Sequence, residues 1–193
     1  FLPDAIPHAQ LEKLLNLAGR APSSSNTQPW QVSVVMGASK TALCEKLLAA
    51  QQAVHAPHYD YPYLPADALP HLYLQRKKAC GLGLYQTLGI TKDDKAAQIQ
   101  HWQANYRGFD APVMCLFWLD AALGQGALID IGGFIQTLAL AAHAEGLGTC
   151  IQASLAQYPH IVRDTLGIAA TQHLICGMSL GYPDPNARIN QYR

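Results

Sequence analysis

The chain has 193 residues, the length of one ordinary domain. Its 13 basic and 13 acidic residues balance, with a sequence pI near 7.2, so neither a basic surface for nucleic acid nor an acidic tail is expected. Charged residues form only 13% of the chain and apolar residues 50%, against about 25% charged in an average domain. This balance predicts a large apolar interface and therefore an oligomer, with a well-filled core as the alternative.

The N-terminal half predicts helices and strands that alternate. Apolar side chains recur at helical spacing over residues 11–18, and Gly19 ends that helix. A polar loop over residues 22–29 follows and is bounded by two prolines. The further elements expected are a strand over 30–36, a helix over 39–50, a long irregular segment over 54–70, a helical arm over 72–88, and a helix through Ile99, Trp102 and Tyr106 with Thr91 and Asp94 as its capping box.

The C-terminal half predicts two more strands and a long apolar helix. The elements expected are a strand over 112–119, a helix over 127–144, a break at 146–148, an extended segment over 149–153, a helix over 158–166, a strand over 173–180 and a closing turn over 181–185. Asp130, Gln136 and His143 interrupt the apolar run over 127–144, which favours a buried helix over a membrane span. No glycine-rich dinucleotide motif follows the first strand. The pattern predicts an α+β fold with one sheet and helices packed around it.

Three signals resemble other kinds of site without meeting their requirements. Residues 177–181 match the G-x-S-x-G motif of serine hydrolases, but Pro183 and Pro185 prevent the helix that the motif requires, so Ser179 is interpreted as an ordinary strand residue. Pro57 breaks the helix that would align the nearby histidines, so no metal site is predicted. The five cysteines form no C-x-x-C pair and no signal peptide is visible, which indicates a reducing, cytoplasmic environment.

The polar loop carries the most specific motif. Its hydroxyls, amide and backbone N–H groups can present donors to a phosphate or a flavin ring, although a solvated connector has the same composition. The stretch Pro22-Ser23-Ser24-Ser25-Asn26-Thr27-Gln28-Pro29-Trp30, between an amphipathic helix and a strand, resembles the signature of the nitroreductase family. The resemblance implies that this loop reaches across a homodimer to FMN bound mainly by the partner subunit. The loop residues it places at the cofactor are Pro22, Ser23, Ser24, Ser25, Asn26 and Gln28.

Two further segments match the family in the same order. Residues 146–153 resemble the segment that passes the edge of the flavin, with a plain strand end as the alternative. The resemblance places Cys150, Ile151, Gln152 and Ala153 beside the ring, with Cys150 as a packing residue and a backbone N–H near Gln152 or Ala153 donating to flavin N5. A weaker match places Asn105 and Arg107 at the pyrimidine edge, although they also fit a solvated helix end. The closing turn is followed by Arg193, which is expected to contact the cofactor.

The resemblance covers nearly the whole chain and implies both fold and activity. The fold expected is a nitroreductase-like domain over residues 1–193, with a central mixed, mostly antiparallel sheet flanked by helices, in an intertwined homodimer. Because the chain begins at Phe1, we expect the arms that hold the FMN phosphate to lie beyond the given residues. The activity implied is NAD(P)H-dependent reduction of nitroaromatics, quinones or similar acceptors, by ping-pong hydride transfer at flavin N5 and with no catalytic side chain. A flavin-binding or flavin-remodelling protein without this activity is the alternative.

Overall fold

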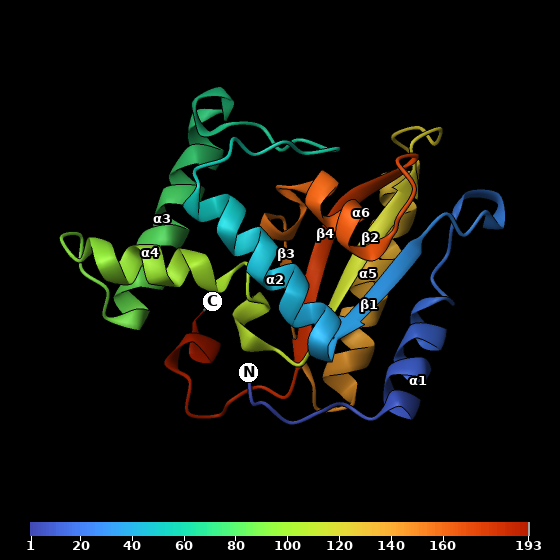
Figure 1. Cartoon of the computed structure of the whole chain (residues 1–193), viewed down its shortest axis with the longest axis horizontal. Helices are drawn as coiled ribbons and strands as arrows, with labels where there is room; N and C mark the ends of the chain where they lie inside the picture. The colour runs from blue at the N-terminus through green and yellow to red at the C-terminus, as the bar shows by residue number, and fades with distance from the viewer. Residues whose placement is uncertain (193) are drawn as a thin grey trace.

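A computed structural model, which describes residues 1–192, shows a four-stranded sheet with helices on both faces (Figure 1). The strands are β1 (Gln31–Met36), β2 (Val113–Asp120), β3 (Gly148–Gln152) and β4 (Gln172–Gly181). The helices are α1 (His8–Ala18), α2 (Gly37–Gln52), α3 (His71–Leu88), α4 (Lys95–Ala104), α5 (Ala127–Ala144) and α6 (Pro159–Leu166). The strand order is β1-β2-β4-β3, and every neighbouring pair is antiparallel. The expected α+β fold with a mostly antiparallel sheet is therefore confirmed.

Strand β2 lies inside the sheet and is buried on both of its faces. Successive side chains of a strand point to opposite faces. Val113, Cys115 and Phe117 accordingly pack with α1 and α5, whereas Met114 and Leu116 pack with α2 and α6. Figure 1 shows α2 and α6 over one face of the sheet and α5 over the other. This double burial explains why β2 is apolar from Val113 to Leu119 without interruption.

By length and composition alone, helix α5 is apolar enough to cross a membrane, with a mean hydropathy of 1.4, although its polar residues had favoured a buried helix. In the fold it packs as a core helix. Its buried stripe, which includes Ile131, Phe134 and Leu138, lies against the sheet and α1. No part of residues 1–192 covers the opposite stripe, on which Ile129 is 80% exposed and Leu140 is 61% exposed.

Helices α3 and α4 project from one edge of the molecule and contribute no buried residue (Figure 1). The N-cap of α4 is Asp94 rather than Thr91, because the Asp94 carboxylate accepts a hydrogen bond from the Ala97 N–H at 2.9 Å. The helix also ends at Ala104, short of Tyr106. There the chain turns towards β2 through Gly108, whose φ of 63° is accessible mainly to glycine.

One buried carboxylate links the irregular segment between α2 and α3 to helix α6 and to the sheet. Asp60 pairs with Arg163 of α6 at 2.6 Å and also accepts a hydrogen bond from the Leu174 N–H of β4 at 2.8 Å. The two charged side chains are only 7% and 16% exposed. Removing one partner of a buried pair leaves the other charge uncompensated, which is strongly destabilising.

We predict that Asp60→Ala lowers the free energy of unfolding by about 3 kcal/mol, because Arg163 loses its partner and the Leu174 N–H loses its acceptor. Urea denaturation followed by circular dichroism measures the change. Asp67→Ala removes an exposed carboxylate from the same segment and should change stability by less than about 0.5 kcal/mol. Equal effects of the two substitutions would contradict the role given to Asp60.

Candidate cofactor site

The loop between α1 and β1 has a strained backbone. Ser25, Asn26 and Gln28 have positive φ values of 50°, 58° and 47°. Residues other than glycine and asparagine rarely adopt this left-handed conformation. Such strain persists only where the surrounding structure imposes it, and it is concentrated at functional sites.

Hydrogen bonds within and beneath the loop impose this backbone. The Ser23 hydroxyl oxygen accepts from the Gln28 N–H at 2.9 Å, and the Asn26 N–H donates to the Ser23 carbonyl at 3.0 Å. Beneath the loop, Asp130 in the first turn of α5 accepts from the Ser24 N–H at 3.1 Å. Four polar side chains remain exposed and have no hydrogen-bond partner within residues 1–192, those of Ser24, Ser25, Asn26 and Thr27.

A second polar cluster joins the end of α4 to β3. Gln152 is 4% exposed, and its Nε2 donates to the Asn105 carbonyl oxygen at 2.9 Å. Its Oε1 accepts from the Ser179 hydroxyl at 2.5 Å. The Ser154 hydroxyl, just beyond β3, donates to the Asn105 side-chain oxygen at 3.3 Å. The structure therefore brings together Asn105 and the segment 150–153, which are far apart in the sequence.

Strand β3 is an edge strand, because β4 is its neighbour on one side and no described strand lies on the other. Alternate backbone groups of an edge strand point away from the sheet and are free to bind other molecules. Ile151 is 48% exposed, and the Ala153 N–H has no partner among the described residues. Burial raises the pKa of the Cys150 thiol, which keeps it protonated and suits a packing residue. The edge therefore offers an apolar contact surface and backbone donors.

Arg107 does not join the Asn105–Gln152 cluster. Its Nε pairs with the Asp110 carboxylate at 3.0 Å, and its carbonyl oxygen accepts from Lys40 Nζ at 3.1 Å. Its side chain lines a small cavity of about 290 Å³ with residues of α2. Contact between Arg107 and a flavin stays a prediction, and Arg193 lies outside the described residues.

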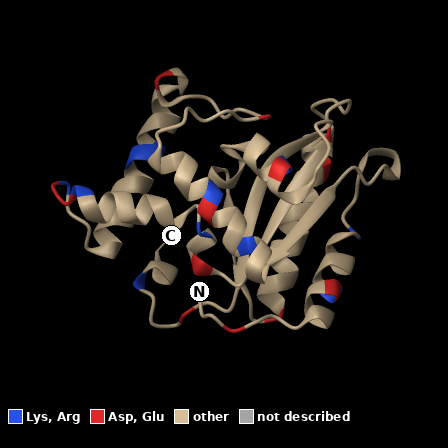
Figure 2. Cartoon of the chain, in the orientation of Figure 1, with Lys and Arg blue, Asp and Glu red and all other residues tan. Residues whose placement is uncertain are grey.

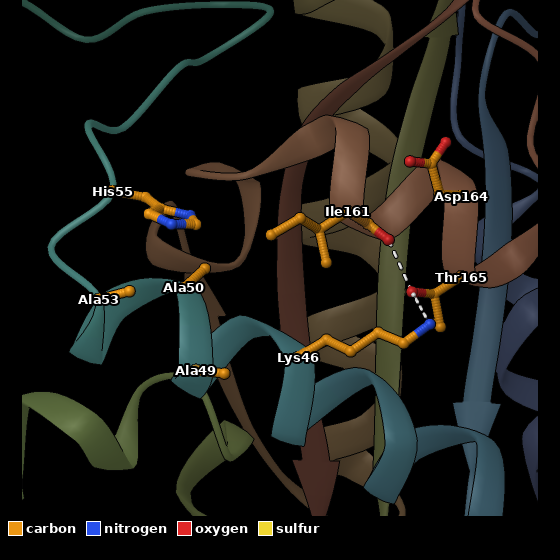
Figure 3. Close-up of a pocket in the computed structure, with 8 residues that line it drawn as sticks. All are labelled: Lys46, Ala49, Ala50, Ala53, His55, Ile161, Asp164 and Thr165. Atoms are coloured by element: carbon orange, nitrogen blue, oxygen red, sulfur yellow. Dashed lines mark hydrogen bonds between the residues drawn. The ribbon is translucent and has the colours of Figure 1, made fainter.

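The cavity in Figure 3 is separate from the loop and from the cluster. It lies between α2 and α6 and has a volume of about 480 Å³. Lys46 Nζ donates across it to the Thr165 hydroxyl oxygen at 3.2 Å, and that hydroxyl donates to the Ile161 carbonyl at 2.7 Å. None of the residues that line the cavity was predicted to bind a cofactor.

Within one subunit, the loop and the cluster lie at opposite edges of the sheet. The loop leads into β1 and the cluster lies at the end of β3, and both β2 and β4 separate these strands. Three inter-strand spacings correspond to about 14 Å. Figure 1 shows the loop projecting beyond α1 and β1, on the side away from α3 and α4. One subunit alone therefore does not bring the two predicted parts of the site together.

The exposed groups of both parts fit the chemistry of a flavin. The isoalloxazine ring has apolar faces and a rim of hydrogen-bond donors and acceptors. The unpartnered side chains of residues 24–26 and the outward N–H groups of β3 can match that rim. The exposed Ile151 can lie against a ring face. The residues present are therefore compatible with FMN shared between two subunits.

Two residues of this site were not predicted from the sequence. Asp130 anchors the loop, although it had been considered only as an interruption of an apolar helix. Ser179 is fully buried and bonded to Gln152, so it is not an ordinary strand residue. The available signal was its position as a lone hydroxyl in an otherwise apolar strand.

Comparison with known proteins gives consistent results. Residues 1–182 match the sequence profile of the Nitroreductase family. The chain is 37% identical to a 4-nitrobenzoate reductase of Pseudomonas putida, over 100% of this chain and 84% of that protein. It is 36% identical to a 4-nitrobenzoate reductase of Nocardioides sp. (strain LMS-CY), over 93% and 73%. The crystal structure of the FMN-dependent nitroreductase NfnB from Mycobacterium smegmatis in complex with NADPH superimposes with a TM-score of 0.93 at 34% identity, covering 100% of this chain and 86% of that one.

Proposed function

The chain belongs to the nitroreductase family, and from that membership we propose that it is an FMN-dependent NAD(P)H oxidoreductase that reduces nitroaromatics, quinones or similar acceptors. The observation that carries this proposal is the likeness, over the whole chain, to an FMN-dependent nitroreductase that binds NADPH. NADPH is therefore the donor that we favour. The 4-nitrobenzoate reductases among the relatives make a nitroaromatic compound the acceptor to test first.

The residues of this chain bind and orient the cofactor. Bound FMN would supply the redox chemistry, namely the transfer of a hydride from the nicotinamide and of two electrons to the acceptor. The hydroxyls of Ser24 and Ser25 and the amide of Asn26 hold the rim of the ring from one subunit. The β3 edge of the other subunit supplies a backbone N–H near Gln152 or Ala153, and Ile151 excludes water from the ring face. No side chain of the cluster needs to transfer a proton, which agrees with its composition of amides and hydroxyls.

The course of α5 supports a homodimer in which the two parts of the site meet. The helix begins beside the loop, where Asp130 binds the Ser24 N–H, and its last residue lies four positions before β3 begins. Its 18 residues span about 27 Å. If a twofold axis crosses the middle of α5, the start of one helix lies beside the end of its partner. The loop of one subunit then lies near β3 of the other.

The exposed stripe of α5 is the surface that we propose for this contact. Ile129, Gly132, Gln136, Leu140 and His143 follow one another at helical spacing and are all exposed. A Cβ added at Gly132 would meet nothing within 4 Å, so the helix is open to close approach at that position. An exposed helix face that carries no acidic or basic residue of the Asp, Glu, Lys or Arg type and presents Ile129 and Leu140 is typical of a subunit interface. We treat residues 1–193 as a single domain, because one sheet carries both cores.

The cysteines support a reducing environment. All five are free in the structure. Burial raises the pKa of the Cys115 and Cys176 thiols to about 12, so both stay protonated and unreactive at neutral pH. Free, buried thiols without a disulfide framework are usual in cytosolic proteins. We therefore propose the cytoplasm as the location of the protein.

We predict that the FMN-loaded protein oxidises NADPH when 4-nitrobenzoate is supplied. Loss of NADPH absorbance measures turnover, and the same protein stripped of FMN is the control, because the flavin carries the redox chemistry. An FMN-loaded protein that turns over no nitroaromatic or quinone, with either NADPH or NADH, would contradict the proposal. That result would favour the flavin-binding alternative.

We predict that Asn26→Ala and Ser24→Ala each weaken FMN binding about 5- to 10-fold, because each removes one hydrogen bond to the cofactor. Quenching of flavin fluorescence measures the dissociation constant, and circular dichroism checks that the fold is intact. Ser39→Ala removes an exposed hydroxyl on α2 and should leave FMN binding unchanged. Wild-type titration curves for both loop variants would contradict the place given to the loop.

We predict that Leu140→Glu raises the dimer dissociation constant at least about 30-fold, because it puts a charge into an apolar contact twice in each dimer. Analytical ultracentrifugation measures the oligomeric state. Val54→Glu is the matched control, since Val54 is 86% exposed and lies away from α5 on the segment that follows α2. A dimer equally weakened by both variants, or by neither, would rule out α5 as the interface.

A further inference from the structure

Ser179 is the most deeply buried polar side chain within residues 1–192, with no exposed surface. It lies on β4, where its register partners are Cys150 on β3 and Met114 on β2. A hydroxyl in such surroundings is costly unless it forms a hydrogen bond. Its bond to Gln152 Oε1, at 2.5 Å, meets that requirement.

The direction of the hydrogen bonds around Gln152 is determined by one backbone group. The Asn105 carbonyl oxygen can only accept, so the Nε2 of Gln152, 2.9 Å away, must face it. The Oε1 of Gln152 then faces Ser179, whose hydroxyl must donate. The carboxamide of Gln152 is therefore held at both ends, and its orientation follows from chemistry rather than from an assignment of its amide atoms.

The turn before β2 closes over the Ser179 hydroxyl. A Cβ added at Gly108 would lie 2.7 Å from Ser179 Oγ and 3.1 Å from Met114 Cε. Glycine at this position therefore allows the backbone to pass directly over the serine. Because this backbone excludes water from the serine, Gln152 is the hydrogen-bond partner of the hydroxyl. The hydroxyl therefore fixes the orientation of the Gln152 carboxamide.

We propose that Ser179 is a positioning residue for the flavin site and that it acts through Gln152. This inference rests on the proposed function, in which the backbone near Gln152 and Ala153 faces the flavin, and on the prediction that Asn105 lies at the pyrimidine edge of the ring. The Ser179–Gln152–Asn105 chain of hydrogen bonds connects β4, the end of β3 and the end of α4. It fixes these two flavin-facing segments relative to each other.

Replacing Ser179 with alanine leaves Gln152 Oε1 buried without a donor. The carboxamide then turns or admits water, and its bond to the Asn105 carbonyl loosens. Both segments that face the flavin lose their common anchor, although neither loses a residue that touches the cofactor. The effect of Ser179 should therefore be seen in FMN binding and in the flavin spectrum, and it should depend on Gln152.

The first experiment compares Ser179→Ala with Ser33→Ala. Ser33 lies on β1, and its hydroxyl oxygen accepts a hydrogen bond from Trp118 Nε1 at 3.0 Å. Ser33→Ala is therefore a matched control, because it also removes one hydrogen bond of a serine within the sheet. Three properties are measured for each variant. They are FMN affinity by fluorescence titration, the visible spectrum of the bound flavin, and the exchange rate of the Gln152 side-chain amide in flavin-free protein. We expect Ser179→Ala to weaken FMN binding about 5- to 10-fold, shift the flavin bands and speed amide exchange. Ser33→Ala should leave all three unchanged.

The second experiment asks whether Ser179 acts through Gln152. In a Gln152→Met background the carboxamide is absent, so adding Ser179→Ala should change the FMN dissociation constant by less than about twofold. Additive effects of the two substitutions would overturn the proposal, as would wild-type FMN binding and spectrum in Ser179→Ala. Failure of the wild-type protein to bind FMN would overturn the proposed function itself, and with it this inference. If the wild-type protein binds FMN and Ser179→Ala binds it equally well, this inference is overturned and the proposed function stands.

Discussion

The burial of β2 on both faces is the constraint from which the rest of the architecture follows. A strand that is apolar on both sides requires helices above and below it, and α1 with α5 and α2 with α6 provide them. Strands β1 and β4 flank β2 and β3 pairs with the other side of β4, so β1 and β3 are the two edges of the sheet. The residues that bind a cofactor by our proposal lie near these edges. The same burial that stabilises the core therefore separates the two parts of the site.

In our proposal, helix α5 reconciles this separation with one continuous binding site, because it forms the contact between two subunits. Its buried stripe completes the core, and its other stripe leaves Ile129 and Leu140 exposed. Figure 2 shows how sparse the charges are, with acidic and basic residues interspersed and long uncharged stretches of ribbon between them. The low share of charged residues, 13%, is consistent with the homodimer that we propose, in which a second copy covers Ile129 and Leu140.

Local signals in the sequence predicted most of the elements. They failed where contacts between residues far apart in the sequence determine the structure. The spacing of apolar residues predicted the strands and most helices, because the burial of a strand or helix face determines that spacing. The N-cap of α4 is Asp94 and not Thr91, because the Asp94 carboxylate reaches the Ala97 N–H. The loop was predicted from its motif, but its anchor Asp130 lies 106 residues away. Ser179 could not be connected to Gln152 without the pairing of β3 and β4, because only that register brings them together.

The strained loop shows why cofactor binding and dimerisation are expected to be coupled. Its backbone is held in an unfavourable conformation by Ser23 and Asp130, yet the side chains that this conformation presents have no partner within the described chain. Such backbone strain is maintained at functional sites, where the side chains that it presents form contacts with a bound group. In our proposal they are used at the β3 edge of a second subunit, through the flavin between them. Cofactor that binds both subunits stabilises the dimer, and by thermodynamic linkage the dimer strengthens the binding of the cofactor.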